Sequence, residues 1–277
     1  SVVRVFTQKD FQTKGFYTLR DVLNAVPGLQ VQEYIAGHQL VWTRGVQSRY
    51  NNKVLLLIDG VPMRDAFYGN FNVDEMVPLE SIEKIEVLNG PGSVLYGANS
   101  FAGVINITTV EPSDKAINSL SLSAGYNAIS TFRNFYRSGD SKLDVLGFGG
   151  KDRLLPTGIP GSAEYAALDV HERARWAQKM NYNWAPEQRS AMPNSSIQYS
   201  LGKTFEFKNK QSLGYVAAYS YQNNQTFSLN TRREFEESAT GVVQRMELRD
   251  SVFTQNVLNT GMLNLKYSFS PKSNIQL

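Results

Sequence analysis

The segment that most resembles a phosphate-binding loop is rich in glycine and follows a predicted strand. It covers residues 90–97, GPGSVLYG. A dinucleotide-binding fingerprint requires glycine at the position of Leu95, and a P-loop requires a Gly-Lys-Ser/Thr sequence that does not follow here. Phosphate binding is therefore not expected, and the glycines need another explanation.

The other motif that could do chemistry is a histidine followed by a glutamate. His171-Glu172 begins like a zinc-binding HExxH helix, but Arg175 stands where the second histidine is required. With His38 as the second of two histidines and no cysteine in the chain, a metal site cannot be assembled from these ligands. A Gly-x-Ser-x-Gly nucleophile elbow is also missing from the sequence. We therefore expect no catalytic residues, no metal, no cofactor and no enzyme activity.

The composition is that of a folded chain with a weak overall charge. Of 277 residues, 42% are apolar and 12% aromatic, which is enough for a sizeable core. The formal charge of +3 is too small to indicate a nucleic-acid partner. The longest candidate apolar run, Val54–Ile58, is far shorter than the roughly 18 residues of a membrane-spanning helix. Strands of a membrane β-barrel remain compatible with this pattern, because they alternate apolar and polar residues.

Residues 1–112 have the pattern of a compact α+β domain. Thr18 is expected to cap a short helix that ends near Ala25, before Pro27-Gly28. A helical turn is predicted at Pro78–Ile82, and Asp59-Gly60 marks a tight turn after an apolar strand. The predicted strands cover residues 2–6, 29–32, 40–42, 54–58, 84–88 and 102–107.

Residues 113–277 have a different pattern, in which one face of each strand is apolar and aromatic and the other is polar. Strands are predicted near 117–126, 197–207, 212–223 and 257–269, and a fifth begins at 275. Long connections near 127–195 and 224–256 alternate with short turns, and a helix is predicted within 163–180. This asymmetry is typical of transmembrane barrels, which have long outer loops and short periplasmic turns. The alternative is a soluble antiparallel domain with two large insertions.

Four ordered blocks in the first part resemble the plug domain of TonB-dependent outer-membrane receptors. They are residues 19–31 (LRDVLNAVPGLQV), 43–46 (TRGV), 54–62 (VLLLIDGVP) and 81–107, which begins SIEKIEV and ends FAGVINI. Two later segments, 143–156 (LDVLGFGGKDRLLP) and 183–186 (NWAP), look like barrel segments of Bacteroidetes members of this family.

The resemblance implies an α+β plug domain over residues 1–112, followed by antiparallel transmembrane β-barrel strands. Residues 113–277 would be the N-terminal portion of that barrel, with long extracellular loops near 127–195 and 224–256. The family implies about 22 strands around the plug, each taking about 10 residues. Because only five strands can be identified, the sequence is expected to be an incomplete receptor.

The resemblance also gives structural roles to residues of the plug. Gly92 and Gly97 would let the backbone pass close to the barrel wall, and Gly103 would permit a tight approach next to the final strand, although these glycines could equally make ordinary turns. Arg44 could form ion pairs with Glu83 and Glu86 between plug and wall, the alternative being exposed pairs of little consequence. Strand-ending and turn positions complete the set: Arg44, Gly45, Asp59 and Gly60.

Ligand contacts are expected in the segments between plug strands, which should form apical loops at residues 47–52 and 64–72. Their aromatic, amide and charged side chains suit a polar ligand with some flat apolar surface. An ordinary solvated loop is the alternative. The candidate ligand-binding residues are Arg49, Tyr50, Asn51, Arg64, Phe67, Tyr68, Asn70 and Phe71.

The function implied by the resemblance is import of a scarce ligand across the bacterial outer membrane. A TonB-type energy-transducing protein would engage a short extended segment upstream of Ser1, which is absent here, so this chain is expected to be uncoupled. Other implied partners are outer-membrane lipid, the transported ligand and a surface lipoprotein, but not nucleic acid. A binding or adhesion barrel that does not transport is the main alternative, and a soluble β-rich enzyme is the third.

Overall fold

The computed structural model describes residues 2–276 with gaps, and it divides into two compact units. The gaps are 34–38, 47–52, 65–70, 74–75, 91–92, 98–99, 139–140, 151–153, 181–184, 208–209, 239–240 and 271–272. One unit comprises Ser1–Leu120, Gln198–Ser220 and Thr260–Leu277, and the other comprises Ser121–Ile197 and Tyr221–Asn259. Each unit is described by itself.

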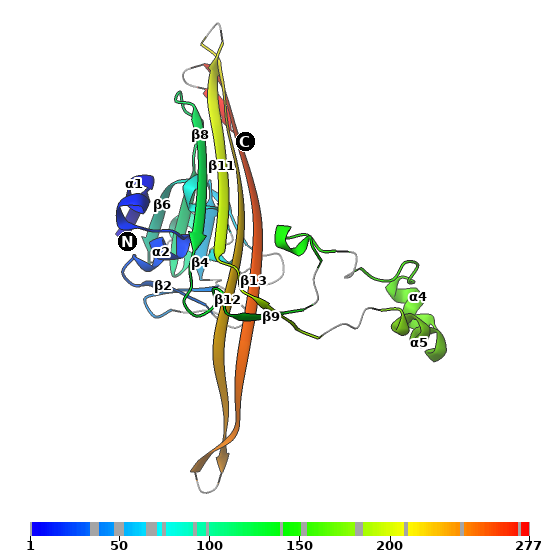
Figure 1. The fold of residues 1–277 in the computed structure, drawn as a ribbon. Coiled ribbons are helices and arrows are strands. Elements are labelled where there is room, and N and C mark those ends of the chain that lie inside the picture. Colours follow the sequence, from blue (N-terminus) through cyan, green and yellow to red (C-terminus); the bar gives the residue numbers. More distant parts are fainter. Residues whose placement is uncertain are drawn as a thin grey trace. The chain divides into compact units, whose positions relative to one another are not determined.

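The first part of the chain folds into a mixed sheet, a hairpin and short helices (Figure 1). The sheet has the order β1-β6-β7-β4-β5, and β2 and β3 form the hairpin. The elements are β1 (Val2–Thr7), α1 (Gln8–Lys14), α2 (Leu19–Asn24), β2 (Leu29–Glu33), β3 (Gln39–Thr43), β4 (Val54–Ile58), β5 (Val61–Pro62), η3 (Leu79–Ser81), β6 (Ile82–Asn89), α3 (Ser93–Tyr96) and β7 (Gly103–Thr109).

Hydrophobic burial explains the arrangement of this sheet. β4 is parallel to β7, and its first four residues are buried, as expected for a strand covered on both faces. In β6 the buried side chains alternate with more exposed ones, and Ile82, Ile85 and Val87 are fully enclosed. They pack with residues of β7 and α2 in one apolar cluster. The strands and the helical turn predicted for this part are confirmed.

The helices α1 and α2 each begin with a capping box. As predicted, Thr18 caps α2: its hydroxyl accepts from the Asp21 N–H at 3.2 Å, and Asp21 accepts from the Thr18 N–H at 2.9 Å. The helix α1 was not predicted from the sequence. It has the same motif, with the Thr7 N–H donating to Asp10 at 2.9 Å. Only Phe11 of α1 is buried, so this helix has no apolar periodicity that would predict it.

After the first part comes a five-stranded sheet with the order β14-β13-β12-β11-β8. Its strands are β8 (Ile117–Gly125), β11 (Asn194–Glu206), β12 (Ser212–Ser238), β13 (Gly241–Ser270) and β14 (Ser273–Gln276). The predicted domain boundary at residue 112 lies between the end of β7 and the start of β8, and it stays a prediction. Between β8 and β11 lie β9 (Asn134–Arg137), η5 (Asp144–Leu146), α4 (Ser162–Ala167), α5 (Val170–Gln178) and β10 (Glu187–Ser190), with β9 antiparallel to β10.

β11 and β13 expose apolar side chains and turn polar ones inward. In β13 Leu263 and Leu265 are exposed, whereas the intervening Asn264 and the following Lys266 are partly buried. In β11 Gln198 is buried between the exposed Ile197 and Tyr199. The predicted alternation is confirmed, and its direction is the reverse of that in a water-soluble sheet.

The prediction of a long connecting loop near 224–256 is wrong, because most of these residues belong to two long strands. β12 and β13 run for 27 and 30 residues and leave only residues 239–240 between them, outside the described residues. The alternation of long and short links suggested a loop, but opposite charges pair across this hairpin. Arg233 Nε lies 2.9 Å from Glu247 Oε2, and Arg245 Nη1 lies 3.6 Å from Glu236 Oε2.

The helix predicted within 163–180 is present as two helices. α4 ends at Ala167, and α5 begins after Asp169, whose carboxylate accepts from the Glu172 N–H at 2.8 Å. This N-cap starts a new helix where the sequence pattern suggested a continuous one. Within the described ranges, no helix is long and apolar enough to cross a membrane.

The stability of α1 should depend on pH through the carboxylate of its capping box. Hydrogen bonds from the backbone and then the hydroxyl of Thr7 lower the pKa of Asp10. A carboxyl group with a lowered folded-state pKa stabilises the fold above its unfolded pKa, and the contribution is lost as pH falls through the folded pKa. Asp10→Ala should therefore reduce hydrogen-exchange protection of the α1 amides at neutral pH, and the difference from the unchanged protein should vanish in strong acid.

The matched control is Asp114→Ala, which removes an exposed aspartate outside any helix. It should leave the protection of α1 unchanged at both pH values. A loss of protection in Asp10→Ala that persisted undiminished in strong acid would contradict the role of the ionised carboxylate.

Candidate functional site

Most of the predicted ligand-binding residues fall in parts of the chain that the structure does not describe. Arg49, Tyr50, Asn51, Phe67, Tyr68 and Asn70 lie outside the described residues. Arg64 is described and exposed. These residues keep their predicted role as a proposal.

Phe71 requires a correction. Its side chain is only 4% exposed and belongs to the apolar cluster of the first part, together with Val73. The expected apical loop therefore ends before Phe71, because this aromatic side chain packs inward rather than toward a ligand.

The predicted ion pairs of Arg44 are replaced by other contacts. Glu86 Oε1 lies 3.2 Å from Lys84 Nζ, two residues away on the same face of β6. Glu86 also accepts from the side-chain amide of its cross-strand neighbour Asn106 at 3.0 Å. Glu83 is exposed. Arg44 has a positive φ of 49°, and its N–H donates to the Gly28 carbonyl at 2.6 Å, so it shapes the turn after β3.

The predicted glycines serve different purposes. A Cβ at Gly103 would lie 2.7 Å from the Leu88 carbonyl oxygen, so the close approach is to the neighbouring strand β6. Gly45, Gly60 and Gly97 have φ values of 78°, 80° and 84°, with nothing near the position of a Cβ, as expected for turns. Gly92 lies outside the described residues.

Asp59 organises the end of the sheet of the first part. From the turn between β4 and β5, its Oδ1 accepts from the Thr109 N–H at 2.8 Å and its Oδ2 accepts from the Thr109 hydroxyl at 2.6 Å. Its own N–H donates to the Ile107 carbonyl at 2.9 Å. One carboxylate therefore fixes the last residue of β7, as a charge-assisted hydrogen bond can do well.

The same threonine is bound by a side chain of β13. The Asn264 amide donates to the Thr109 hydroxyl at 2.8 Å and to the Val110 carbonyl at 3.1 Å. Two residues further along the same face of β13, Lys266 Nζ lies 2.8 Å from Glu111 Oε2. We call these residues the plug anchor: Asp59, Thr109, Glu111, Asn264 and Lys266.

A second polar contact lies near the start of β6. Gln198 of β11 donates to the Ser81 hydroxyl at 3.2 Å, and both residues are buried. A cavity of about 580 Å³ lies beside the plug anchor and is lined by residues of β6, β7 and the segment after them, including Glu83, Glu86 and Glu111. The sequence singled out Asp59, Glu83 and Glu86 but missed Asn264 and Lys266, whose only signal is their place on the polar face of a strand.

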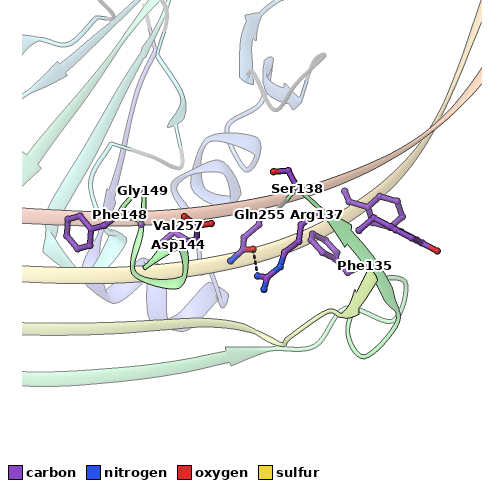
Figure 2. A pocket seen from close by; sticks show the side chains of 11 residues that line it. Phe135, Arg137, Ser138, Asp144, Phe148, Gly149, Gln255 and Val257 are labelled. Atoms are coloured by element: carbon purple, nitrogen blue, oxygen red, sulfur yellow. Dashed lines mark hydrogen bonds between the residues drawn. The ribbon is translucent and has the colours of Figure 1, made fainter. Parts of the chain in front are cut away.

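The other unit contains a pocket of about 370 Å³ between β9, the η5 segment and β13. Figure 2 shows Phe148 at one end of the row of lining side chains and Phe135 near the other, with Asp144, Gln255 and Arg137 between them. None of these residues was predicted as a site. Asp144 and Phe148 lie in the segment 143–156 that resembles barrel segments, but that resemblance gave them no ligand role, and the lining residues of β9 and β13 are far apart from each other in the sequence.

The plug anchor generates a stability prediction. Asn264→Leu keeps the approximate size of the side chain but removes the amide that donates to Thr109 and Val110. Leaving buried acceptors without their donor typically costs about 1–3 kcal/mol, so the midpoint of thermal unfolding should fall. Asn256→Leu, at an exposed asparagine of the same strand, should change the midpoint little. Equal effects of the two substitutions would contradict the role of Asn264.

The comparisons with known proteins agree with this architecture. A family model described as the TonB-dependent Receptor Plug Domain matches residues 1–104. The vitamin B12 transporter BtuB of Vibrio vulnificus strain CMCP6 is 32% identical over 230 residues, covering 78% of this chain and 36% of that protein. BtuB of Photobacterium profundum is 29% identical over 153 residues, covering 55% of this chain and 24% of that protein. The chain thus spans about a third or less of the length of these relatives.

Solved structures to which the chain is similar include two receptors. The ferric yersiniabactin uptake receptor FyuA of Yersinia pestis gives a TM-score of 0.48 at 14% identity, covering 96% of this chain and 38% of that chain. The siderophore receptor PirA of Pseudomonas aeruginosa gives 0.41 at 17% identity, covering 96% and 43%.

The family assignment rests on the plug domain match and the sequence relatives. The relatives are named as transporters, which agrees with the expectation that the chain is not an enzyme. The resemblance to Bacteroidetes members stays a prediction. Residues 1–104 are a plug domain, and the chain belongs to the TonB-dependent receptors of the bacterial outer membrane.

Proposed function

We propose that the whole protein imports a scarce ligand across the outer membrane, using energy that a TonB-type protein transmits from the inner membrane. The observation that supports this most is the plug anchor. A plug domain is bound through polar side chains to strands whose apolar side chains face outward. Such contacts can break and re-form in water more readily than apolar packing, because water satisfies the separated groups.

The plug also offers a place where an upstream pull could act. Among the described strands β1 lies at the edge of its sheet, where it pairs with β6, and its Val3 and Val5 are exposed. Edge strands are the least constrained members of a sheet. We propose that a TonB-type partner acts through the chain upstream of β1, and that β7, fixed by the plug anchor, is the part of the sheet that yields last. We also propose a surface lipoprotein as a partner, and no contact among the described residues supports this part of the proposal.

Both sequence relatives are named vitamin B12 transporters, so vitamin B12 is the first ligand to test. Uptake of radiolabelled cyanocobalamin, and of a ferric siderophore as the second probe, would be measured in cells that carry the full-length gene as their only receptor. A protonophore that dissipates the proton-motive force should abolish uptake while leaving binding at the cell surface.

Cells without the gene provide the background for this experiment. Uptake that continues after the proton-motive force is dissipated would contradict energised transport. Binding without any uptake, with or without energy, would instead favour the alternative of a barrel that binds or adheres but does not transport.

A further inference from the structure

The pocket of Figure 2 has the size and construction of a small-molecule site. Its volume of about 370 Å³ lies at the lower end of the range for ligand pockets, about 300–1,000 Å³. All of its lining residues belong to one unit, in the ranges 121–197 and 221–259. None of its lining residues belongs to the segments 47–52 and 64–72, in which ligand contacts were expected from the sequence.

One end of the pocket is a preformed aromatic wall. Phe135 is 2% exposed, and its ring meets Phe253 edge to face at a centroid distance of 5.5 Å. Tyr136 and Phe227 lie 5.2 and 4.9 Å from the same Phe253 ring. Rings packed against each other in this way restrict one another's rotation, so this wall needs little ordering when a ligand binds.

The other end is an aromatic side chain that faces solvent. Phe148 is 62% exposed although it lines the pocket. The η5 segment before it is fixed on neighbouring strands, because Asn259 donates to the Leu146 carbonyl at 2.9 Å and the Tyr221 hydroxyl donates to the Val145 carbonyl. Gly147 has a φ of 82°, and a Cβ there would lie 2.9 Å from the Asn259 amide nitrogen, so a larger residue would strain the backbone and displace Asn259. The backbone therefore presents Phe148 at a defined place.

The described residues at the centre of the pocket are polar, and their one positive and one negative side chain balance in charge. Arg137 Nη1 lies 3.5 Å from Gln255 Oε1, and the Gln255 amide also donates to Asn223 at 3.4 Å. Asp144 accepts from the Ser141 N–H at 3.1 Å. Among the lining residues Arg137 and Asp144 carry opposite charges, and Ser138 adds a hydroxyl. The centre thus combines donors and acceptors in closely spaced, planar groups.

We infer that this pocket binds a sugar, that is, a neutral ring with hydroxyl groups at its edge and a flat apolar face. Each sugar hydroxyl both donates and accepts hydrogen bonds, which matches the mixture of donors and acceptors among the central residues. The apolar face of the ring would cover Tyr136 or Phe148 and remove aromatic surface from water. An ionic ligand would bring a charge for which the described lining residues, with one positive and one negative side chain, supply no net counter-charge. The inference adds a ligand class to the proposed receptor function and does not depend on energised import.

The test is saturation-transfer NMR on the purified protein in detergent, followed by calorimetry with any binder. The probes are methyl glucoside, methyl mannoside, maltose and cellobiose, with glucuronate as the charged counterpart. We expect at least one neutral saccharide to bind and glucuronate to bind more weakly. Phe148→Ala should weaken the binding about tenfold, as expected for the loss of about 1.4 kcal/mol of stacking.

The matched control is Phe235→Ala, which removes a phenyl ring of similar exposure, 60%, in the same unit but outside the pocket. A second variant, Gln255→Leu, should also weaken binding while the thermal unfolding midpoint shows whether the fold is intact. If no neutral saccharide binds, or if Phe148→Ala and Phe235→Ala behave alike, the inference is wrong. Energised uptake of another ligand would be unaffected by that result, so the two proposals fail separately.

Discussion

The hydroxyl of Thr109 makes two hydrogen bonds at once, and the position of the plug depends on both. It donates to Asp59 at 2.6 Å within the plug and accepts from Asn264 at 2.8 Å from β13. The residue is buried, with 3% of its surface exposed, so an unpaired group there would be costly. Within the plug the carboxylate joins the β4–β5 turn to β7, and the amide joins β7 to the strand that follows later in the chain.

The polarity of the later strands follows from the same requirement. A wall that binds a plug through hydrogen bonds must present polar side chains inward, and its apolar side chains then face the other way. β13 shows this directly, since Leu263 and Leu265 are exposed and Asn264 and Lys266 contact the plug. In a lipid surround the exposed apolar face is favourable, which agrees with the outer-membrane location of the family.

The sequence predicted most of the plug, because its strands and α2 carry strong local signals. The apolar run at Val54–Ile58 and the Thr18 cap were correctly interpreted. α1 was missed since seven mostly polar residues give no periodicity. Residues 224–256 were taken for a loop because long and short connections were expected to alternate, whereas the strands there form a hairpin that pairs charges. The candidate sites were harder to predict. Asn264 meets Thr109 across 155 residues of sequence, and no local pattern reports such a contact.

The coupling between Thr109 and Asn264 is the central claim about the plug. A double-mutant cycle measures this coupling most directly. Thr109→Val, Asn264→Leu and the double variant would be unfolded in urea from lipid vesicles and compared with the unchanged protein. Contacting residues in one hydrogen-bond network show interaction energies of about 0.5–3 kcal/mol, and we expect a favourable coupling in this range. Strictly additive effects of the two substitutions would show that β13 does not fix the plug through this contact.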